Sequence, residues 1–389
     1  MTLTSQYFAD FHIHVGRSKD QPVKMAAARN LTVEAVFREA RERKGLDIIT
    51  LIDGVCTNVL SELKELVGQD RLRAVPCGGY QFENGLMVLI GSEVEVGGPV
   101  GGAAHFGCWF PTLDAATDFH DWLATVQTNP SLSSQRARAD AYKLQTETTS
   151  RGGLFIIHHA FTPHKGMYGN CVSHLTDMVD GAKVDALELG LSADSDMADC
   201  IHELKDITFI SNSDAHSAAK IAREYNALQL QAATFDEVKF ALRRQGERFI
   251  TANFGLHPAL GKYHRSRCAK CGETWNEETG RCSCGSTKQV IGVYDRLLQI
   301  RDSDAPFHPQ HRPPYRYQVP LEFVPGLGPK SLARLLDEFG SEMAVLNRVS
   351  FDELANVVGK QLADVIDKSR SGEVQFIEGG GGVYGKLIL

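Results

Sequence analysis

The sequence predicts an α/β barrel or a doubly wound parallel sheet for residues 1–257, followed by smaller parts of different character. Three observations lead to this prediction. Short apolar segments alternate with amphipathic helical ones over the first 257 residues, as they do in α/β folds. Nearly every apolar segment ends in histidine, aspartate or glutamate, and the alternation stops where a cysteine-rich stretch begins. A chain of 389 residues is also long enough for more than one domain.

The strands and helices of this first part are predicted from the spacing of apolar residues. Strands are expected at Tyr7–Ile13, Asp47–Ile52, Leu86–Ser92, Leu154–His158, Ala186–Leu189 and Thr208–Asn212. A helix is expected over Thr32–Lys44, because Thr32 suits the N-cap and apolar residues follow it at helical spacing. The carboxyl ends of parallel strands meet on one face of such a fold, and that face carries the chemistry.

Histidines and carboxylates follow the predicted strands and form a candidate metal site. His12 and His14 alternate at the end of the first strand, so both side chains can reach one metal ion. Asp214 and His216 repeat this alternation after the last predicted strand. Further members of the set are Asp53, Glu93, His105, His158, His159, His164 and Glu188. Imidazole and carboxylate ligands together favour zinc, manganese or iron.

Four cysteines in a short stretch predict a second metal site. Their order is Cys268-x2-Cys271-x10-Cys282-x-Cys284, and paired thiolates across short loops bind zinc tetrahedrally. We expect this zinc to fold a small module and not to catalyse, because structural sites leave no open coordination position. The remaining cysteines are scattered, which indicates a reduced, cytoplasmic chain and not a disulfide framework.

The C-terminal part is predicted to be helical and to bind DNA. The turn Gly326-Leu327-Gly328 opens a helix and is followed by Lys330, so backbone N–H groups and a cation face the same anion. This pattern resembles a helix-hairpin-helix motif, and residues 358–363 resemble a degenerate second hairpin. A helical bundle with a glycine turn is the alternative interpretation. The predicted boundaries are 1–257 for the barrel, 258–290 for the zinc module, 291–320 for a Pro/Arg-rich connector and 321–389 for the DNA-binding region.

Charge and hydropathy limit the possible partners. The net charge is −7, yet residues 261–316 carry ten Lys/Arg against six Asp/Glu, a net of +4, so the remainder carries −11. A basic segment beside an acidic body is compatible with a module that meets phosphate, although ordinary surface variation would also produce it. No apolar run approaches the roughly 20 residues of a membrane-spanning helix, and the N-terminus lacks the pattern of a secretion signal. We therefore expect a cytoplasmic protein with no membrane partner.

The ligand pattern resembles the polymerase-and-histidinol-phosphatase (PHP) superfamily, which has D-x-H-x-H near the N-terminus and S-D-A-H late in the chain. The resemblance implies a PHP-type distorted (β/α)7 barrel with two or three divalent metals that hydrolyse phosphoesters. Position by position, it implies one metal on His12, His14, Glu93 and Asp214, a second on Glu93, His105 and His159, and His216 at a third. The usual Thr-Asp-His motif is Ile52-Asp53-Gly54 here, so a third site would need Asp53 or Asp20.

A PHP barrel, a four-cysteine knot and a helix-hairpin-helix-like end, in this order, resemble the endonuclease Q family, as do the segments 159–166 and 186–194. The resemblance implies a DNA repair endonuclease that cleaves 5′ to deaminated bases (uracil, hypoxanthine, xanthine) and abasic sites. Its partners would be double- or single-stranded DNA with damaged bases. Its cofactors would be zinc, manganese or magnesium in the barrel and one structural zinc.

Specific residues are assigned to these roles. The catalytic residues are expected to be Glu93, His159 and Asp214, and the DNA-binding residues Lys165, Tyr168, Gly326, Gly328 and Lys330. The damaged base would be flipped out of the stack and read by the 161–170 loop, with Tyr168 stacking on it.

Two alternatives remain from the sequence. The first is a small-molecule phosphatase of the histidinol-phosphate kind, and the second is a DNA-binding protein whose barrel has lost activity. The C-terminal residues speak against the first, because a small phosphate monoester needs neither a zinc knot nor a DNA hairpin.

Overall fold

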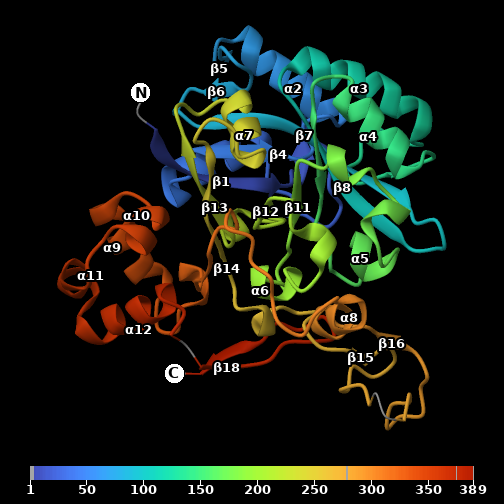
Figure 1. Cartoon of the computed structure of the whole chain (residues 1–389). Coiled ribbons are helices and arrows are strands. Elements are labelled where there is room, and N and C mark those ends of the chain that lie inside the picture. Colours follow the sequence, from blue (N-terminus) through green and yellow to red (C-terminus); the bar gives the residue numbers. More distant parts are fainter. Residues whose placement is uncertain (1–3, 277–278, 374, 389) are drawn as a thin grey trace.

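The fold is a mixed α/β barrel with smaller parts packed at one end (Figure 1). A computed structural model describes residues 4–276, 279–373 and 375–388. The main sheet contains, in spatial order, β12 (Phe209–Ile210), β11 (Ala186–Glu188), β10 (Leu154–Ile157), β8 (Ala103–Phe110), β7 (Met87–Gly97), β4 (Ile48–Leu51), β1 (Ser5–Ile13), β13 (Tyr225–Leu230), β14 (Phe249–Gly255) and β17 (Tyr315–Tyr317). Strands β1, β4 and β7 are parallel, as are β10, β11 and β12, whereas β8 is antiparallel to both its neighbours.

The sheet curls until the chain after β12 meets β1 again. Ile13 and Ala215 form a parallel bridge, in which the His14 amide donates to the Ala215 carbonyl at 3.1 Å. The Ala215 amide donates in turn to the His12 carbonyl at 3.2 Å. Strands β1, β4, β7, β8, β10, β11 and β12 therefore surround a common axis, and the predicted distorted barrel is confirmed.

Two asparagine side chains complete the closure where the strands lack a backbone ladder. The Asn226 side chain on β13 exchanges hydrogen bonds with the backbone of Ser211, at 2.9 and 2.8 Å. Asn253 on β14 donates to the Phe209 carbonyl at 3.1 Å and to Asn226 Oδ1 at 2.9 Å. The strand that the sequence predicts as the last is therefore followed by two antiparallel strands, β13 and β14.

The predicted position of Glu93 at the end of a strand is wrong. Strand β7 continues to Gly97 and forms a long hairpin with β8, in register from Ile90–Phe110 to Gly97–Ala103. Almost every residue of β7 is buried on both faces, so the sequence lacks the polar alternation that would show its length. Glu93 consequently lies mid-strand, and His105 is carried by the partner strand.

Helices cover the outside of the barrel (Figure 1). The longer ones are α1 (Val33–Arg38), α2 (Thr57–Gly68), α3 (Leu113–Val126), α4 (Ala141–Thr149) and α7 (Phe235–Leu242), with the short helices α5 (Met167–Asn170) and α6 (Ser195–Ala198). The Thr32 hydroxyl caps α1 as predicted, and the helix widens into a π-type turn over Glu39–Lys44. Small strands are β2 (Arg17–Ser18), β3 (Gln21–Pro22), β5 (Leu72–Ala74), β6 (Tyr80–Phe82) and β9 (Arg136–Ala137). Within the described residues, no helix has both the length and the apolar character needed to cross a bilayer.

The residues after 257 form two groups at the lower end of the barrel in Figure 1. The cysteine-rich stretch is framed by β15 (Arg267–Cys268) and β16 (Gln289–Val290) and is followed by α8 (Val293–Ile300). The opposite group contains α9 (Pro329–Phe339), α10 (Glu342–Asn347), α11 (Phe351–Val358) and α12 (Lys360–Arg370). The chain then forms a hairpin of β18 (Gln375–Ile377) and β19 (Lys386–Ile388).

These parts are joined to the barrel by more than a linker. The residues predicted as a connector include α8 and β17, and β17 adds to the barrel sheet beside β14. Apolar residues of α9–α12 belong to the same buried cluster as the barrel. Lys44 Nζ lies 2.9 Å from Glu342 Oε2, and both side chains are almost fully buried. The barrel and the C-terminal helices therefore share an apolar core and a buried ion pair.

Candidate active site

The residues predicted to bind the first metal converge at one end of the barrel. His12 and His14 leave the same face of β1, and their Nε2 atoms are 3.3 Å apart. Glu93 Oε2 lies 3.1 Å from His12 Nε2. Asp214 Oδ1 lies 3.5 Å from His12 Nε2 and 3.4 Å from His14 Nε2. His12, His14 and Glu93 therefore offer ligand atoms within 4.8 Å of one another to a divalent ion, and Asp214, which forms a neighbouring group with His14 and His216, lies beside both imidazoles.

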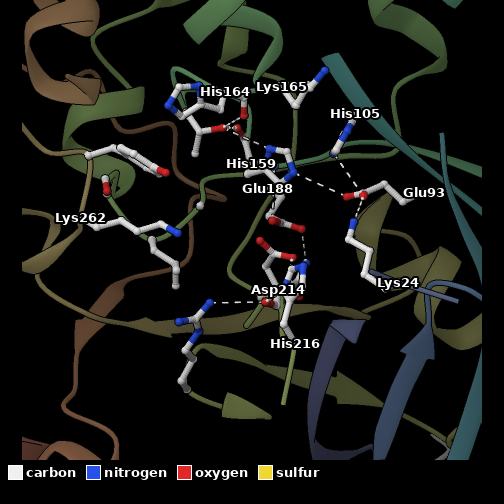
Figure 2. A pocket seen from close by; sticks show the side chains of 17 residues that line it. Lys24, Glu93, His105, His159, His164, Lys165, Glu188, Asp214, His216 and Lys262 are labelled. Carbon is white, nitrogen blue, oxygen red and sulfur yellow. Dashed lines mark hydrogen bonds and ion pairs between the residues drawn. The ribbon is translucent and has the colours of Figure 1, made fainter. Parts of the chain in front are cut away.

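Glu93 also belongs to the second predicted set. His105 Nδ1 lies 3.1 Å from Glu93 Oε1, and His159 Nε2 lies 3.6 Å from Glu93 Oε2 (Figure 2). One ligand atom from each of Glu93, His105 and His159 falls within 4.8 Å of the others. The carboxylate of Glu93 can therefore bridge two ions, as the resemblance implies.

The third predicted site is only partly built. His14, Asp214 and His216 form another group with ligand atoms within 4.8 Å. Asp53 does not join it, because its carboxylate accepts from His14 Nδ1 at 3.1 Å and from the Val15 amide at 2.7 Å. Asp53 instead fixes the ring orientation of His14, a role that carboxylates often have behind a metal-bound histidine. Asp20 is exposed and lies outside these groups.

Three residues of the site carry functions that the sequence did not assign. Glu188 Oε2 lies 2.9 Å from His12 Nδ1 and accepts from Asn212 Nδ2 at 2.9 Å, so it orients His12. His158 Nδ1 lies 3.3 Å from Glu93 Oε2. Lys24 Nζ lies 3.0 Å from Glu93 Oε1. Glu188 and His158 belong to the predicted histidine and carboxylate set but have no role assigned there, whereas Lys24 lies in a loop without any signal.

The electrostatics suit cations. Burial works to raise the pKa of Glu93, yet the charges of His105 and Lys24 outweigh it and hold that pKa well below its usual value. Burial likewise opposes ionisation of Glu188, but His12 lowers its pKa to about 2. Burial also lowers the pKa of His158 to about 4, which keeps its imidazole neutral. The ionised carboxylates are in their metal-binding form. Against the effect of burial, the neighbouring carboxylates raise the pKa of His12 and His105, so a metal ion would displace protons from these imidazoles.

The donor set fits divalent ions. The Nε2 atoms of His12 and His14 face one another at 3.3 Å and share the same neighbouring carboxylates. A zinc, manganese or iron ion stabilises this arrangement. The groups open onto a cavity of about 250 Å³. Its wall also carries the cationic side chains Lys24, Lys165, Arg223 and Lys262. Metal ions and cationic side chains around one cavity can bind a phosphate diester and stabilise the negative charge that develops on it during hydrolysis.

The four cysteines come together as predicted. Cys268 and Cys284 have sulfurs 3.7 Å apart, and Cys271 and Cys282 have sulfurs 3.4 Å apart. All four sulfurs lie within 4.8 Å of one another, and the pairs are too far apart for disulfides, which need about 2.05 Å. Trp275 packs against Cys268 and Cys282 in a small apolar cluster. This geometry can hold one zinc ion.

The glycine turn before α9 leads directly into that helix. Gly326 has φ +79°, and Gly328 caps α9, which begins with Pro329. Lys330 is exposed in the first turn of α9. Gly359, with φ +82°, makes a similar turn between α11 and α12. Gly326, Gly328 and Lys330 are thus all exposed to solvent.

The prediction that Tyr168 stacks on a damaged base is wrong. Its side chain is fully buried, packs against Phe161 and donates its hydroxyl to Glu203 Oε1 at 2.7 Å. The sequence could not show this because it places Tyr168 in a loop, where aromatic residues are often accessible. Lys165, from the same loop, does line the cavity, with Nζ 2.6 Å from Glu95 Oε2.

This barrel and its cluster define a metal-dependent hydrolase. No family model matches the chain. The chain is 42% identical over 388 residues to the uncharacterized protein YqxK of Bacillus subtilis, covering 98% of both. It also superposes on the crystal structure of the lesion-specific endonuclease PfuEndoQ from Pyrococcus furiosus, with TM-score 0.85, 30% identity and coverage of 99% and 96% of the two chains. The chain belongs to the endonuclease Q family.

A second solved structure resembles the chain equally well. It is an endonuclease Q complex with a 27-mer duplex substrate that has an abasic lesion at the active site, with TM-score 0.86 and 30% identity. The match covers 99% of this chain and 97% of that one, so it includes the cysteine knot and the C-terminal helices. The resemblance inferred from the sequence is confirmed.

Proposed function

We propose that this protein is a DNA repair endonuclease that hydrolyses the phosphodiester 5′ to deaminated bases (uracil, hypoxanthine and xanthine) and abasic sites. One observation carries the proposal: a histidine and carboxylate cluster lines a cationic cavity in a chain that matches endonuclease Q over 99% of its length. Nothing in that match calls for a small phosphate monoester as substrate.

The metal-binding residues would hold two divalent ions, zinc, manganese or magnesium, with Glu93 shared between them. Such ions supply a hydroxide near neutral pH and stabilise charge on the phosphate oxygens. The protein itself would contribute by orienting the histidine side chains that bind the ions. Glu188 and Asp53 hold the rings of His12 and His14 so that both Nε2 atoms face Glu93 and Asp214. His216 would complete a third site with His14 and Asp214.

DNA would be held mainly through its phosphates by the parts outside the barrel. Gly326 and Gly328 form an exposed turn in which the Gly328 amide donates to the Gly326 carbonyl, so the cation of Lys330 would make the main contact there, and Lys165 adds a cation at the cavity. Phosphate contacts position a duplex without reading its sequence. We propose the division into residues 1–257 for cleavage, 258–290 for a zinc module, 291–320 as a connector and 321–389 for DNA binding.

The lesion would be read at the barrel. Damaged or mispaired bases cost least to flip out of the stack. Thr162, His164 and Lys165 of the 161–170 loop line the cavity, so this loop would contact the extruded nucleotide without Tyr168. Single-stranded DNA with the same lesions would be cleaved as well, because its bases are already accessible.

A nicking assay tests this function. Duplexes labelled at one 5′ end and containing uracil, hypoxanthine, xanthine, an abasic site or no lesion would be incubated with the protein and Mg²⁺ or Mn²⁺. We expect cleavage immediately 5′ to each lesion, none of the undamaged duplex, and none by Asp214→Asn. Histidinol phosphate serves as the competing substrate. Its hydrolysis without nicking of any lesion duplex would refute the proposal.

A further inference from the structure

Arg223 is a buried cation beside the metal cluster. It precedes β13, is 9% exposed and lines the cavity that contains the metal ligands. Its Nε donates to the Ser213 carbonyl at 2.7 Å, and Nη2 lies 3.4 Å from the Asp214 carbonyl. The guanidinium is therefore held against the chain segment that carries the metal ligand Asp214.

Within the part of the chain that the structure describes, the charge of Arg223 lacks a counterion. Among the described residues, no carboxylate oxygen lies within 4.0 Å of its guanidinium nitrogens; their hydrogen-bond partners are two carbonyls and a tyrosine hydroxyl. The neighbouring Glu224 does not compensate it at neutral pH, because burial raises the pKa of that carboxyl to about 8. Buried charges in proteins are normally paired, so an unpaired guanidinium at a cavity indicates an anionic ligand.

The third partner of Arg223 comes from the C-terminal end of the described chain. Tyr384 accepts from Arg223 Nη1 through its hydroxyl at 2.9 Å. The segment around Tyr384 is itself fixed, because the Gly382 amide donates to Lys262 at 2.8 Å and the Gly385 amide to Leu260 at 2.9 Å. Lys262 lines the same cavity, where Figure 2 shows it opposite Glu93 and Lys24. The glycine-rich segment thus connects to two cations of the cavity.

We propose that Arg223 binds a phosphate of the DNA substrate in this cavity and that Tyr384 positions its guanidinium. An arginine has five N–H donors, and the observed contacts use three of them, one on each nitrogen. One N–H on Nη1 and one on Nη2 remain, and two such donors match the oxygens of a phosphate. The identity of this phosphate as part of DNA rests on the proposed function. Arg223 is thus assigned to substrate binding, and Tyr384 is a positioning residue.

Inorganic phosphate is the probe that tests Arg223. Its affinity for the metal-loaded protein would be measured by calorimetry, together with metal content and Tm, for the parent, Arg223→Gln, Arg223→Lys and Tyr384→Phe. We expect at least ten-fold weaker phosphate binding in Arg223→Gln, partial rescue in Arg223→Lys and a smaller loss in Tyr384→Phe, all with unchanged metal content. Arg73→Gln, which changes an exposed arginine on β5, controls for the substitution and should bind phosphate as the parent does.

Several outcomes would overturn the assignment. Parent-like phosphate affinity in Arg223→Gln with full metal content would show that the arginine only holds Ser213 and Asp214 in place. If Arg223→Gln loses metal or fails to fold, Arg223→Lys decides, because a purely structural arginine would leave its phosphate affinity unchanged in the metal-loaded form. Parent-like affinity in Tyr384→Phe would refute the positioning role. A protein that nicks no lesion but still requires Arg223 for phosphate binding would refute the proposed function alone.

Discussion

Lys24 Nζ contacts Glu93 Oε1 at 3.0 Å, so a nearly buried ammonium group lies against the carboxylate shared by the two predicted metal sets. Ser134 hydrogen-bonds to both residues. Lys24 therefore neutralises part of the negative charge that would otherwise attract divalent ions. It is also one of the four cationic side chains that line the cavity.

Removing this charge should tighten metal binding. A unit charge about 4 Å from another contributes on the order of 4 kcal/mol at an effective dielectric constant near 20, and a Lys24–metal repulsion would be of this kind. We expect Lys24→Met to bind Mn²⁺ at least ten-fold more tightly in calorimetry, and to be less stable than the parent without metal. Lys19→Met, which removes a neighbouring lysine paired with Glu65, is the control. Weaker Mn²⁺ binding by Lys24→Met would contradict this interpretation.

Asp214 should be required for cleavage but not for DNA binding. Its carboxylate faces His12 and His14 inside the cavity, whose lining does not include the exposed turn at Gly326. We expect Asp214→Asn to reduce nicking of a uracil duplex below detection, while Tm and duplex affinity stay close to those of the parent. Gel-shift titration and a nicking time course on the same preparation measure both. Near-parent nicking by this variant would show that the metal assignment is wrong.

The cysteine knot should hold zinc for folding alone. Metal binding to thiolates is coupled to folding, so removal of one ligand releases both the ion and the local structure. We expect Cys271→Ser to lose one zinc per chain by elemental analysis and to be cleaved by protease within the 263–288 stretch. Cys77→Ser, at an exposed cysteine outside the knot, should keep its zinc. Equal zinc in the parent and Cys271→Ser would count against the site.

The convergence of the candidate metal ligands could be predicted from sequence because their pattern is local. His12 and His14 alternate on one strand, and Asp214 and His216 repeat this after another, so the fold only had to bring two such segments together. Lys24 and Glu188 act through contacts across the barrel, between segments distant in sequence. No spacing within either segment encodes those contacts.

The incorrect predictions arise where burial and tertiary contacts leave no local pattern in the sequence. Strand β8 and the full length of β7 were missed because both strands are largely buried on both faces, which hides the period of two. The sequence predicts that Tyr168 stacks on a flipped base, whereas packing against Phe161 and a hydrogen bond to Glu203 bury its side chain. Local pattern identified the chemistry, and tertiary contacts decided which side chains are accessible.

Glu224 should make stability fall as pH rises. It is fully buried with its Oε1 bonded to the Leu256 amide, and burial raises its pKa from 4.5 to about 8. Between these values the folded protein keeps the proton and the unfolded chain loses it. The stability contributed by the neutral carboxyl is thus complete below pH 4.5 and is lost as pH rises through 8, by about 1.4 kcal/mol per unit.

Replacement by glutamine removes this titration. We expect the Tm of Glu224→Gln to decline less than that of the parent between about pH 5.5 and 8, as measured by scanning calorimetry at constant ionic strength. This range lies between the pKa values of the unfolded and the folded carboxyl. Glu65→Gln, at an exposed carboxylate, should follow the parent. Parallel pH profiles for the parent and Glu224→Gln would show that this carboxyl is already ionised in the folded protein.

Lys330 should contribute to holding DNA and not to choosing the lesion. It is exposed in the first turn of α9, beside the Gly326–Gly328 turn. Each phosphate contact steepens the fall of log affinity with log salt by roughly one unit, and such contacts carry no sequence information. Lys330→Ala should therefore weaken binding to uracil-containing and undamaged duplexes about equally and flatten the salt dependence, while the nicking preference for uracil survives. Fluorescence anisotropy over a salt series measures the slope, with exposed Lys183→Ala as control. Loss of the uracil preference at unchanged overall affinity would refute the separation between a DNA-holding end and a lesion-reading barrel.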